Sequence, residues 1–273
     1  MSEKADDGGD PDRRALYDAY APIEIARRIE AAGVVKARLP LMPLFTLAVL
    51  AGAFIALGSA LYLVAITEHG LGLGPGRLLG GLAFSLGLVL VVIAGAELFT
   101  GNNLIVMAYA DGLIAGRELL YNWTVVFLGN LAGALGTAFM MYVAGIAAIG
   151  DGAVLVTLQD VVAAKTDLFW GEAFMRGVLC NVLVCLAIWL SFAAHSAGGK
   201  LLCVIFPVTA FVALGLEHSI ANLFLFPFAV LSGAKLGMAA MLGNLVPVIL
   251  GNIVGGGGLV GLVYWSVYGR PLR

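Results

Sequence analysis

The stretch GLEHSIAN, residues 215–222, interrupts an otherwise apolar part of the sequence, with VIFPVTAFVAL before it and LFLFPFAV after it. An ionisable side chain at the depth of a bilayer costs about 3 kcal/mol even on lenient insertion scales, so such groups usually face a protein interior or an aqueous path. If this part of the chain crosses a membrane, Glu217 and His218 therefore indicate a functional position.

The composition is that of an integral membrane protein. Hydrophobic residues make up 61% of the chain, charged residues 12%, and the mean hydropathy is +1.01, whereas soluble domains carry roughly 25% charged residues. A transmembrane helix needs about 20 largely apolar residues. The predicted spans are 41–66, 78–110, 119–148, 168–194, 201–231 and 238–268. The formal net charge of −2, with no basic cluster outside the N-terminal arm, argues against a nucleic-acid partner.

Polar stretches interrupt the second and the fifth predicted span. The second contains GAELFTGNN at 95–103 and the fifth contains GLEHSIAN, so each span is expected to form two half-helices too short to cross a bilayer alone. Irregular backbone at that depth persists only where it is buried in protein or lines a cavity. The fold class expected is an all-α membrane protein with interrupted helices two and five.

The segments outside the spans are predicted from composition and charge. Residues 1–20 read as a disordered tail, and they are too polar to contain a cleavable signal peptide. Residues 21–40 are expected to form an amphipathic helix, either an anchor at the lipid surface or a lid over a pore mouth. Basic residues are in excess beside the first span and after the last, which places the tail and the C-terminal residues 269–273 in the cytoplasm and the six-span domain, 41–268, in the cytoplasmic (inner) membrane.

The two polar stretches belong to a repeat. Both read G-x-E-x-x-x-x-N, and L-G-N-x-x-G recurs once in the third span and once in the sixth. Because each half contains three spans, an odd number, the second half must cross the membrane in the opposite direction. The sequence therefore predicts a 3+3 inverted repeat whose broken helices meet near the midplane. The polar residues expected at this interface are Glu97, Asn102, Asn130, Glu217, Asn222 and Asn252.

At GAELFTGNNLI, RGVLCNVLVCLAIWLSF, GLEHSIANLFLFP and LGNIVGGG the chain resembles the formate/nitrite transporter family, over about residues 20 to 270. The resemblance implies an aquaporin-like protomer of six helices, assembled as a homopentamer in the lipid bilayer. Each protomer would carry its own pore for small monovalent anions such as formate, nitrite or hydrosulfide, without a cofactor or a metal ion.

The resemblance also assigns site residues. It implies a central pore histidine at His218, a pore-facing loop tip at Thr100 and a polar residue beside the chamber at Asn181. It implies polar positions near the filter at Lys165, Glu217 and Asn222. It implies apolar constrictions, with Phe84 and Leu88 on one side of the chamber and Phe99, Phe211 and Val184 towards the other. The chain departs from the family pattern at Leu216, where several members have an aromatic residue, and at the tip GNN, where some have short Ser/Thr runs.

The residues themselves suggest a mechanism. Apolar rings exclude water, so a bare anion loses its hydration there, while a neutral acid crosses more easily. His218, with a reference pKa of about 6.5, could share a proton with the anion, and half-helix N-termini place a positive dipole end near it. Lys165, in the loop AAKTDLF, would attract the anion at the entrance. We therefore expect proton-assisted transport that acidic pH favours, formate being the first substrate on resemblance alone.

Other readings remain open from the sequence. Glu217 and His218 could brace the backbone break without touching a substrate. A hydrosulfide channel of the same family is an alternative, as is a water or neutral-solute pore, although the chain has no Asn-Pro-Ala pair. An intramembrane enzyme is remote, because the sequence contains neither H-E-x-x-H nor G-x-S-x-G. No catalytic residue is predicted.

Overall fold

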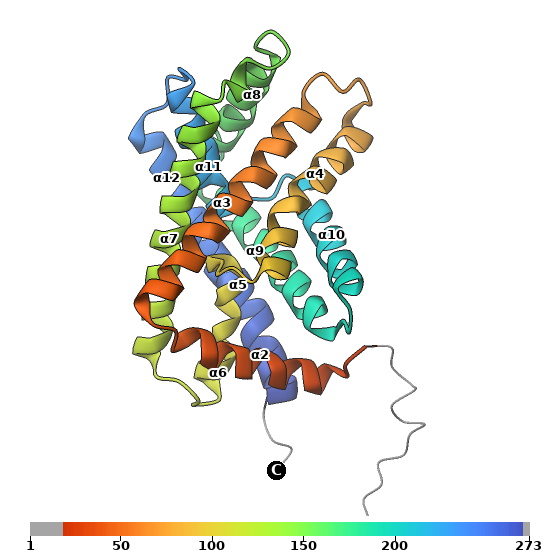
Figure 1. Cartoon of the computed structure of the whole chain (residues 1–273), viewed down its shortest axis with the longest axis vertical. Helices are drawn as coiled ribbons and strands as arrows, with labels where there is room; N and C mark the ends of the chain where they lie inside the picture. Colours follow the sequence, from red (N-terminus) through yellow and green to blue (C-terminus); the bar gives the residue numbers. More distant parts are fainter. Residues whose placement is uncertain (1–18, 270–273) are drawn as a thin grey trace, which may run out of the picture.

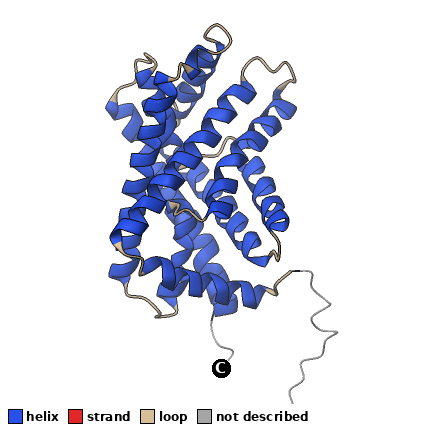
Figure 2. Ribbon diagram, in the orientation of Figure 1, coloured by secondary structure: helices blue, strands red, loops and turns tan. Residues whose placement is uncertain are grey.

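A computed structural model describes residues 19–269, and every regular element in that range is helical (Figure 2). The long helices run side by side as a bundle, with helix α2 across one end (Figure 1). Helices are the expected solution for apolar segments of this kind, because each backbone N–H and C=O group is bonded within its own segment and needs no water.

Within residues 19–269, five segments are long and apolar enough to cross a membrane: Leu41–Ile66, Leu73–Ala94, Gly116–Val143, Trp170–Ala193 and Met238–Gly269. The elements in chain order are α2 (Pro22–Ala37), α3 (Leu41–Ile66), α4 (Leu73–Ala94), α5 (Phe99–Asn102), η1 (Asn103–Ile105), α6 (Val106–Ala110), α7 (Gly116–Val143), η2 (Ile146–Ala148), α8 (Ala153–Thr166), α9 (Trp170–Ala193), α10 (Ala197–Ala213), α11 (Ser219–Leu231), α12 (Met238–Ile253), η3 (Val254–Leu262) and η4 (Trp265–Gly269). The segments 1–18 and 270–273, which include most of the predicted tails, lie outside the described residues.

The two interrupted spans differ in a way that the sequence did not reveal. Helix α4 has 22 residues and is long enough to cross by itself, so the expectation of two short halves is wrong for the second span. In the fifth span, α10 has 17 residues and α11 has 13, as expected for a broken helix. Both interruptions begin at a glycine in the left-handed backbone region, with φ of +80° at Gly95 and +69° at Gly215. Glycine adopts this conformation without the steric strain that a Cβ atom would add.

Helix α8 was not predicted, and it changes the place of Lys165. The residue lies in the last turn of this helix and not in a loop. Val154, Leu158 and Val162 recur every four residues and form the buried face of α8, which is the spacing of an amphipathic helix. The segment is too short to cross a membrane, and a search for spans alone passes over it.

Small residues let the long helices approach closely. A methyl group at Gly52 on α3 would collide with the backbone carbonyl of Asn130 on α7, and one at Gly251 on α12 would collide with the carbonyl of Phe174 on α9. Backbone contact of this kind is the usual basis of helix association in membranes, where burial of apolar surface gives little driving force.

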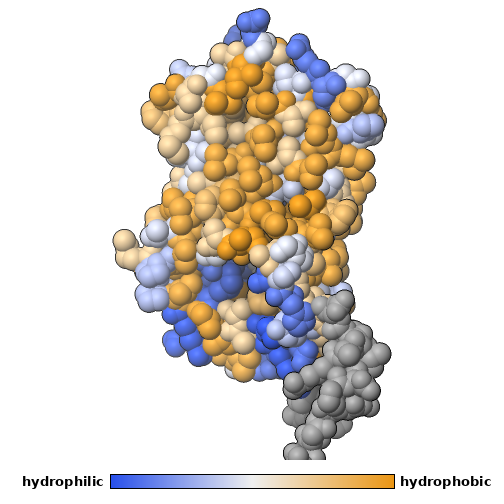
Figure 3. All heavy atoms as spheres, turned by 45° about the vertical axis from the view of Figure 1, so that its right-hand side comes forward, coloured by the Kyte–Doolittle hydropathy of each residue, from blue (hydrophilic) through white to orange (hydrophobic). Residues whose placement is uncertain are grey.

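The surface fits a membrane environment. On the face drawn in Figure 3, hydrophobic residues form a broad band around the middle, and hydrophilic residues gather towards the two ends. Helix α2 lies against the protein at one of these ends, with Ile25, Ala26 and Ile29 buried. The start of α2 and the end of η4 lie at the same end of the molecule (Figure 1).

Glu30 belongs to the buried face of α2; it is 7% exposed, and its Oε1 atom has no hydrogen-bond partner in the described part of the chain. Helix α2 lies outside the membrane-spanning segments. Burial, and after it the nearby Asp111 carboxylate, raise the pKa of Glu30 to about 7, while Arg27 opposes the shift. Because the folded-state pKa exceeds the usual value of 4.5, the protonated form stabilises the docked helix.

We therefore expect α2 to dock most firmly at acidic pH and to loosen as the pH rises through about 7. Glu30→Gln should remove this dependence and keep α2 docked at pH 8. Hydrogen exchange of the amides of 22–37, corrected for intrinsic rates, measures it. Glu24→Gln, at an exposed position of the same helix, is the control and should keep the dependence. Equal protection of the unaltered protein at pH 5 and pH 8 would contradict the role of Glu30.

Candidate functional site

The two interrupted spans meet at His218 and Thr100. The Nε2 atom of His218 lies 3.1 Å from the hydroxyl oxygen of Thr100, and both side chains are buried. The Nδ1 atom accepts a hydrogen bond of 3.2 Å from the backbone N–H of Ala221 and so caps α11. The Phe211 ring stacks beside the imidazole at 5.9 Å between centroids, and the Phe84 ring meets it edge-on at 6.4 Å.

This geometry assigns the tautomer of His218. A ring nitrogen can accept a hydrogen bond from a backbone N–H group only if it is unprotonated. Nδ1 therefore carries no proton, and the proton of the neutral imidazole is on Nε2. The Nε2–H group then donates to Thr100. A second proton on Nδ1, which would make the ring cationic, requires the bond from Ala221 to be released. The charge of His218 is thus coupled to the start of α11.

A cavity of about 310 Å³ lies on one side of His218, and we call it the Lys165 vestibule. Phe84, Phe211 and His218 lie in its wall together with Lys165 and Glu217. The rings of Phe84 and Phe211 are in edge contact at 5.5 Å between centroids. The two aromatic rings and the imidazole therefore border the same space.

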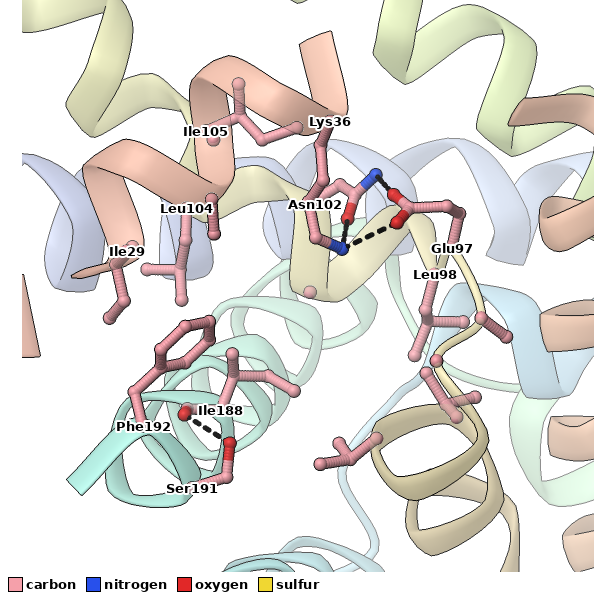
Figure 4. A pocket seen from close by; sticks show the side chains of 17 residues that line it. Ile29, Lys36, Glu97, Leu98, Asn102, Leu104, Ile105, Ile188, Ser191 and Phe192 are labelled. Atoms are coloured by element: carbon pink, nitrogen blue, oxygen red, sulfur yellow. Dashed lines mark hydrogen bonds and ion pairs between the residues drawn. The ribbon is translucent and has the colours of Figure 1, made fainter. Parts of the chain in front are cut away.

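A second cavity of about 220 Å³ lies under α2, and we call it the Lys36 vestibule (Figure 4). In the close-up, Lys36, Glu97 and Asn102 point towards one another on one part of the wall. The remainder is mostly apolar and includes Leu98 and Ile188. The segment 95–98 that follows α4 contributes to this cavity, so the two vestibules lie next to the two interruptions.

Each vestibule contains a lysine paired with a buried glutamate. Lys36 Nζ lies 2.9 Å from Glu97 Oε1, and Lys165 Nζ lies 2.8 Å from Glu217 Oε1. In both, the second carboxylate oxygen accepts a hydrogen bond of 2.7 Å from an asparagine that lies five residues further along the chain. These asparagines are Asn102 and Asn222.

A second asparagine completes each network. Asn102 Nδ2 donates to Asn122 Oδ1 at 3.0 Å, and Asn222 Nδ2 donates to Asn244 Oδ1 at 2.8 Å. Asn122 and Asn244 in turn donate to the backbone carbonyls of the two lysines, at 3.0 and 2.9 Å. The charges of both glutamates are therefore compensated by a lysine and by an asparagine N–H donor, which lowers the penalty for burying an ion pair. The networks differ in one atom: Asn102 Oδ1 accepts from Lys36, whereas Asn222 Oδ1 has no hydrogen-bond partner within the described residues.

The L-G-N-x-x-G asparagines hold the backbone at the interruptions. Asn130 Oδ1 accepts from the N–H of Phe99 at 2.9 Å, and Asn252 Oδ1 accepts from the N–H of Ser219 at 3.0 Å. Their Nδ2 groups donate to the carbonyls of the two glutamates, at 2.9 and 3.1 Å. Asn181 performs a related task, since its Nδ2 donates to Thr100 O at 3.2 Å and to Asn103 Oδ1 at 2.7 Å.

The expected constrictions are arranged differently in the structure. Phe211 shares the Lys165 vestibule with Phe84, so its assignment to the opposite side is wrong; α10 packs against α4 and brings the two rings together. Phe99 packs against Phe127 at 5.2 Å and lines a groove on α7 and α12, away from both vestibules. Leu88 and Val184 are buried in the core and line neither vestibule.

Sequence reasoning missed several residues of the site. Lys36, Asn122 and Asn244 belong to the buried networks, and Leu98 lines the Lys36 vestibule. Asn122 and Asn244 could have been found from the sequence, because each follows the asparagine of a G-x-E motif at a similar distance, 20 and 22 residues. Lys36 carried none, since its partner Glu97 is 61 residues away. Within 19–269, no three His, Cys, Asp or Glu side chains are grouped to hold a metal ion.

The buried ion pair should show strong coupling. Lys165→Met and Glu217→Gln should each lower the free energy of unfolding by about 3 kcal/mol, because each leaves the other group buried without a charged partner. The double variant should lose less than the sum of the two. Thermal unfolding of the purified protein measures the cycle.

The exposed pair Arg38–Glu118, whose side chains are 57% and 29% exposed, is the matched control and should show coupling below about 1 kcal/mol. Additive losses at Lys165 and Glu217 would contradict the network described above.

Comparison with known proteins identifies the family. Residues 23–266 match the family described as Formate/nitrite transporter. The chain is 38% identical over 274 residues to the formate channel FocA of Escherichia coli K12, covering 93% of this chain and 96% of that one, and 41% identical over 255 residues to the uncharacterized transporter YrhG of Bacillus subtilis, covering 92% and 95%.

Two solved structures agree with this match. A structure described as a pentameric formate channel with formate bound has 40% identity and a TM-score of 0.78, covering 84% of this chain and 98% of that one. A structure described as an FNT family ion channel has 30% identity and a TM-score of 0.83, covering 91% and 99%. Family, relatives and fold agree: the chain belongs to the formate/nitrite transporter family and is a membrane transporter, not an enzyme.

Proposed function

We propose that the protein is a homopentameric channel in the cytoplasmic membrane that carries formate, and also nitrite, with the assistance of protons at His218. The observation that carries the proposal is the buried His218–Thr100 pair at 3.1 Å, in which His218 lines the Lys165 vestibule and Thr100 is adjacent in sequence to Gly101 of the Lys36 vestibule. The relatives named formate channels and the pentameric structure with formate bound support the substrate and the assembly.

The proposed architecture is a six-span inverted repeat, with both termini cytoplasmic. The paired networks support it, because lysine, glutamate and two asparagines recur in the same bonding order on the two sides. The repeat then includes α2 and α8, which supply Lys36 and Lys165. In this reading α2 forms part of one vestibule and is more than a lipid anchor.

The proposed path begins at a lysine. Each lysine is paired with a glutamate, yet an ammonium group keeps further N–H donors that can attract an anion. The anion then reaches Phe84 and Phe211 on one side or Leu98 and Ile188 on the other, where it loses water. A neutral acid crosses such a region at much lower cost than its anion, so protonation assists passage.

His218 takes part by sharing a proton. In the tautomer described above, Nε2–H can turn from Thr100 to an anion without any change of charge. Full transfer of a proton requires the imidazolium form, and that form requires Nδ1 to give up the N–H of Ala221. Acidic pH favours both the protonated substrate and the cationic ring. Transport should therefore increase as the pH falls.

Hydrosulfide is the alternative substrate within the family. A pore for water or neutral solutes is the alternative outside it. A neutral-solute pore needs no titratable group at its centre, so the pH dependence of flux separates the readings.

Replacement of His218 tests the mechanism. His218→Phe should leave the oligomer intact and reduce the ratio of formate uptake at pH 5 to that at pH 7 by about tenfold, the usual contribution of a placed acid–base group being of this order or larger. Uptake of formate, nitrite, hydrosulfide and water into proteoliposomes measures it, with size-exclusion elution as the check on assembly.

Thr100→Ser keeps the hydroxyl group and is the control that should retain the pH dependence. Unchanged flux of the His218→Phe variant across pH would remove His218 from the mechanism. Rapid water flux of the unaltered protein without uptake of any acid would identify a neutral-solute pore.

A further inference from the structure

Two arginines in the Lys165 vestibule have no part in the mechanism above. Arg77 comes from α4 and Arg176 from α9, and both line this cavity. Arg77 Nη1 donates to the carbonyl of Ala213 at 3.1 Å, and Arg176 Nη1 donates to the carbonyl of Gly215 at 3.4 Å. Two helices that are far apart in the sequence thus direct guanidinium groups to the short backbone segment 213–215, at the end of α10.

The charges of the two guanidinium groups are not neutralised by direct partners. In the residues that the structure describes, no ion pair joins either arginine to a carboxylate. Among the acidic residues that line the cavity, Glu217 is paired with Lys165, which leaves Asp160 at an exposed position. The vestibule therefore carries an excess of positive charge near its aromatic wall.

The hydrogen-bonding capacity of these arginines is also mostly unused. A guanidinium group has five N–H donors in a planar fork, and a single bond to a backbone carbonyl is identified for each. The remaining donors fit an acceptor with two oxygens in one plane, which guanidinium binds through two parallel hydrogen bonds.

We propose that Arg77 and Arg176 form a capture site for small planar anions that carry two oxygens on one atom, such as carboxylates and nitrite. The site lies in the same cavity as Phe84, Phe211 and His218, so an anion held there is already in the space that the imidazole borders. It selects against hydrosulfide and other anions with a single acceptor atom, which cannot use the fork. This inference rests on the proposed function and narrows its substrate class.

Replacement of Arg77 and Arg176 by lysine tests whether these residues bind the anion or only hold the backbone at the end of α10. Lysine keeps the positive charge and can still donate to the carbonyls at the end of α10, but it lacks the fork. In proteoliposomes, Arg176→Lys and the double variant with Arg77→Lys should raise the apparent KM for formate and nitrite by about five- to tenfold. The maximal rate, and the KM for hydrosulfide, should stay within about twofold.

Arg117→Lys is the matched control, because Arg117 is exposed at the start of α7 and lines neither vestibule. It should leave all three KM values unchanged. Equal changes for formate, nitrite and hydrosulfide, or no change in any, would overturn the capture site. If the unaltered protein takes up neither formate nor nitrite, the proposed function fails as well; uptake of both with unchanged KM in the lysine variants removes this site alone.

A second measurement uses the unaltered protein. Phenylglyoxal modifies accessible guanidinium groups, and peptide mass spectrometry reads the modified positions. Formate and nitrite should protect Arg77 and Arg176 several-fold more than equal concentrations of chloride, while Arg117 should be modified equally in all three. Equal protection by chloride would show that charge alone attracts anions here, and the fork would have no role.

Discussion

The fold depends on satisfying the backbone where two membrane helices are interrupted. An unpaired N–H or C=O group at this depth costs several kcal/mol, because no water is present to bond it. Asn130 and Asn252 solve the problem with one amide each, accepting from the N–H of Phe99 or Ser219 and donating to two carbonyls. These amides are fully buried. An interruption that is held in this way can remain open and still be rigid.

Once the interruptions are fixed, the position of the central pair follows. Thr100 and His218 come one residue after Phe99 and one residue before Ser219, the two backbone groups that the asparagines hold. The held carbonyls include those of the buried glutamates themselves, whose side chains bond to a lysine and to further asparagines. One polar framework therefore positions the histidine and keeps charged groups stable inside an apolar bundle.

The sequence was sufficient for the features that local pattern determines. The apolar spans, the G-x-E motifs and the polar residues at 217 and 218 can each be recognised in a short stretch of sequence. The polar residues are conspicuous because an ionisable group at the depth of a bilayer has a high free-energy cost. The sequence was insufficient where a contact depends on how helices turn against one another. Phe211 is an apolar residue in an apolar helix, and only the packing of α10 on α4 shows that it faces Phe84. Lys36 likewise precedes the first span, and nothing local connects it to Glu97.

The order of the charged residues along the chain has a consequence for biosynthesis. Lys36 precedes Glu97, and Lys165 precedes Glu217, so the cation of each pair is synthesised before the carboxylate that it neutralises. Each glutamate therefore emerges from the ribosome when its counter-ion already exists on an earlier segment. The asparagines that complete the networks, at 122 and 244, follow on the next helix. Each network is thus complete in the chain once the helix that carries its last asparagine has been synthesised.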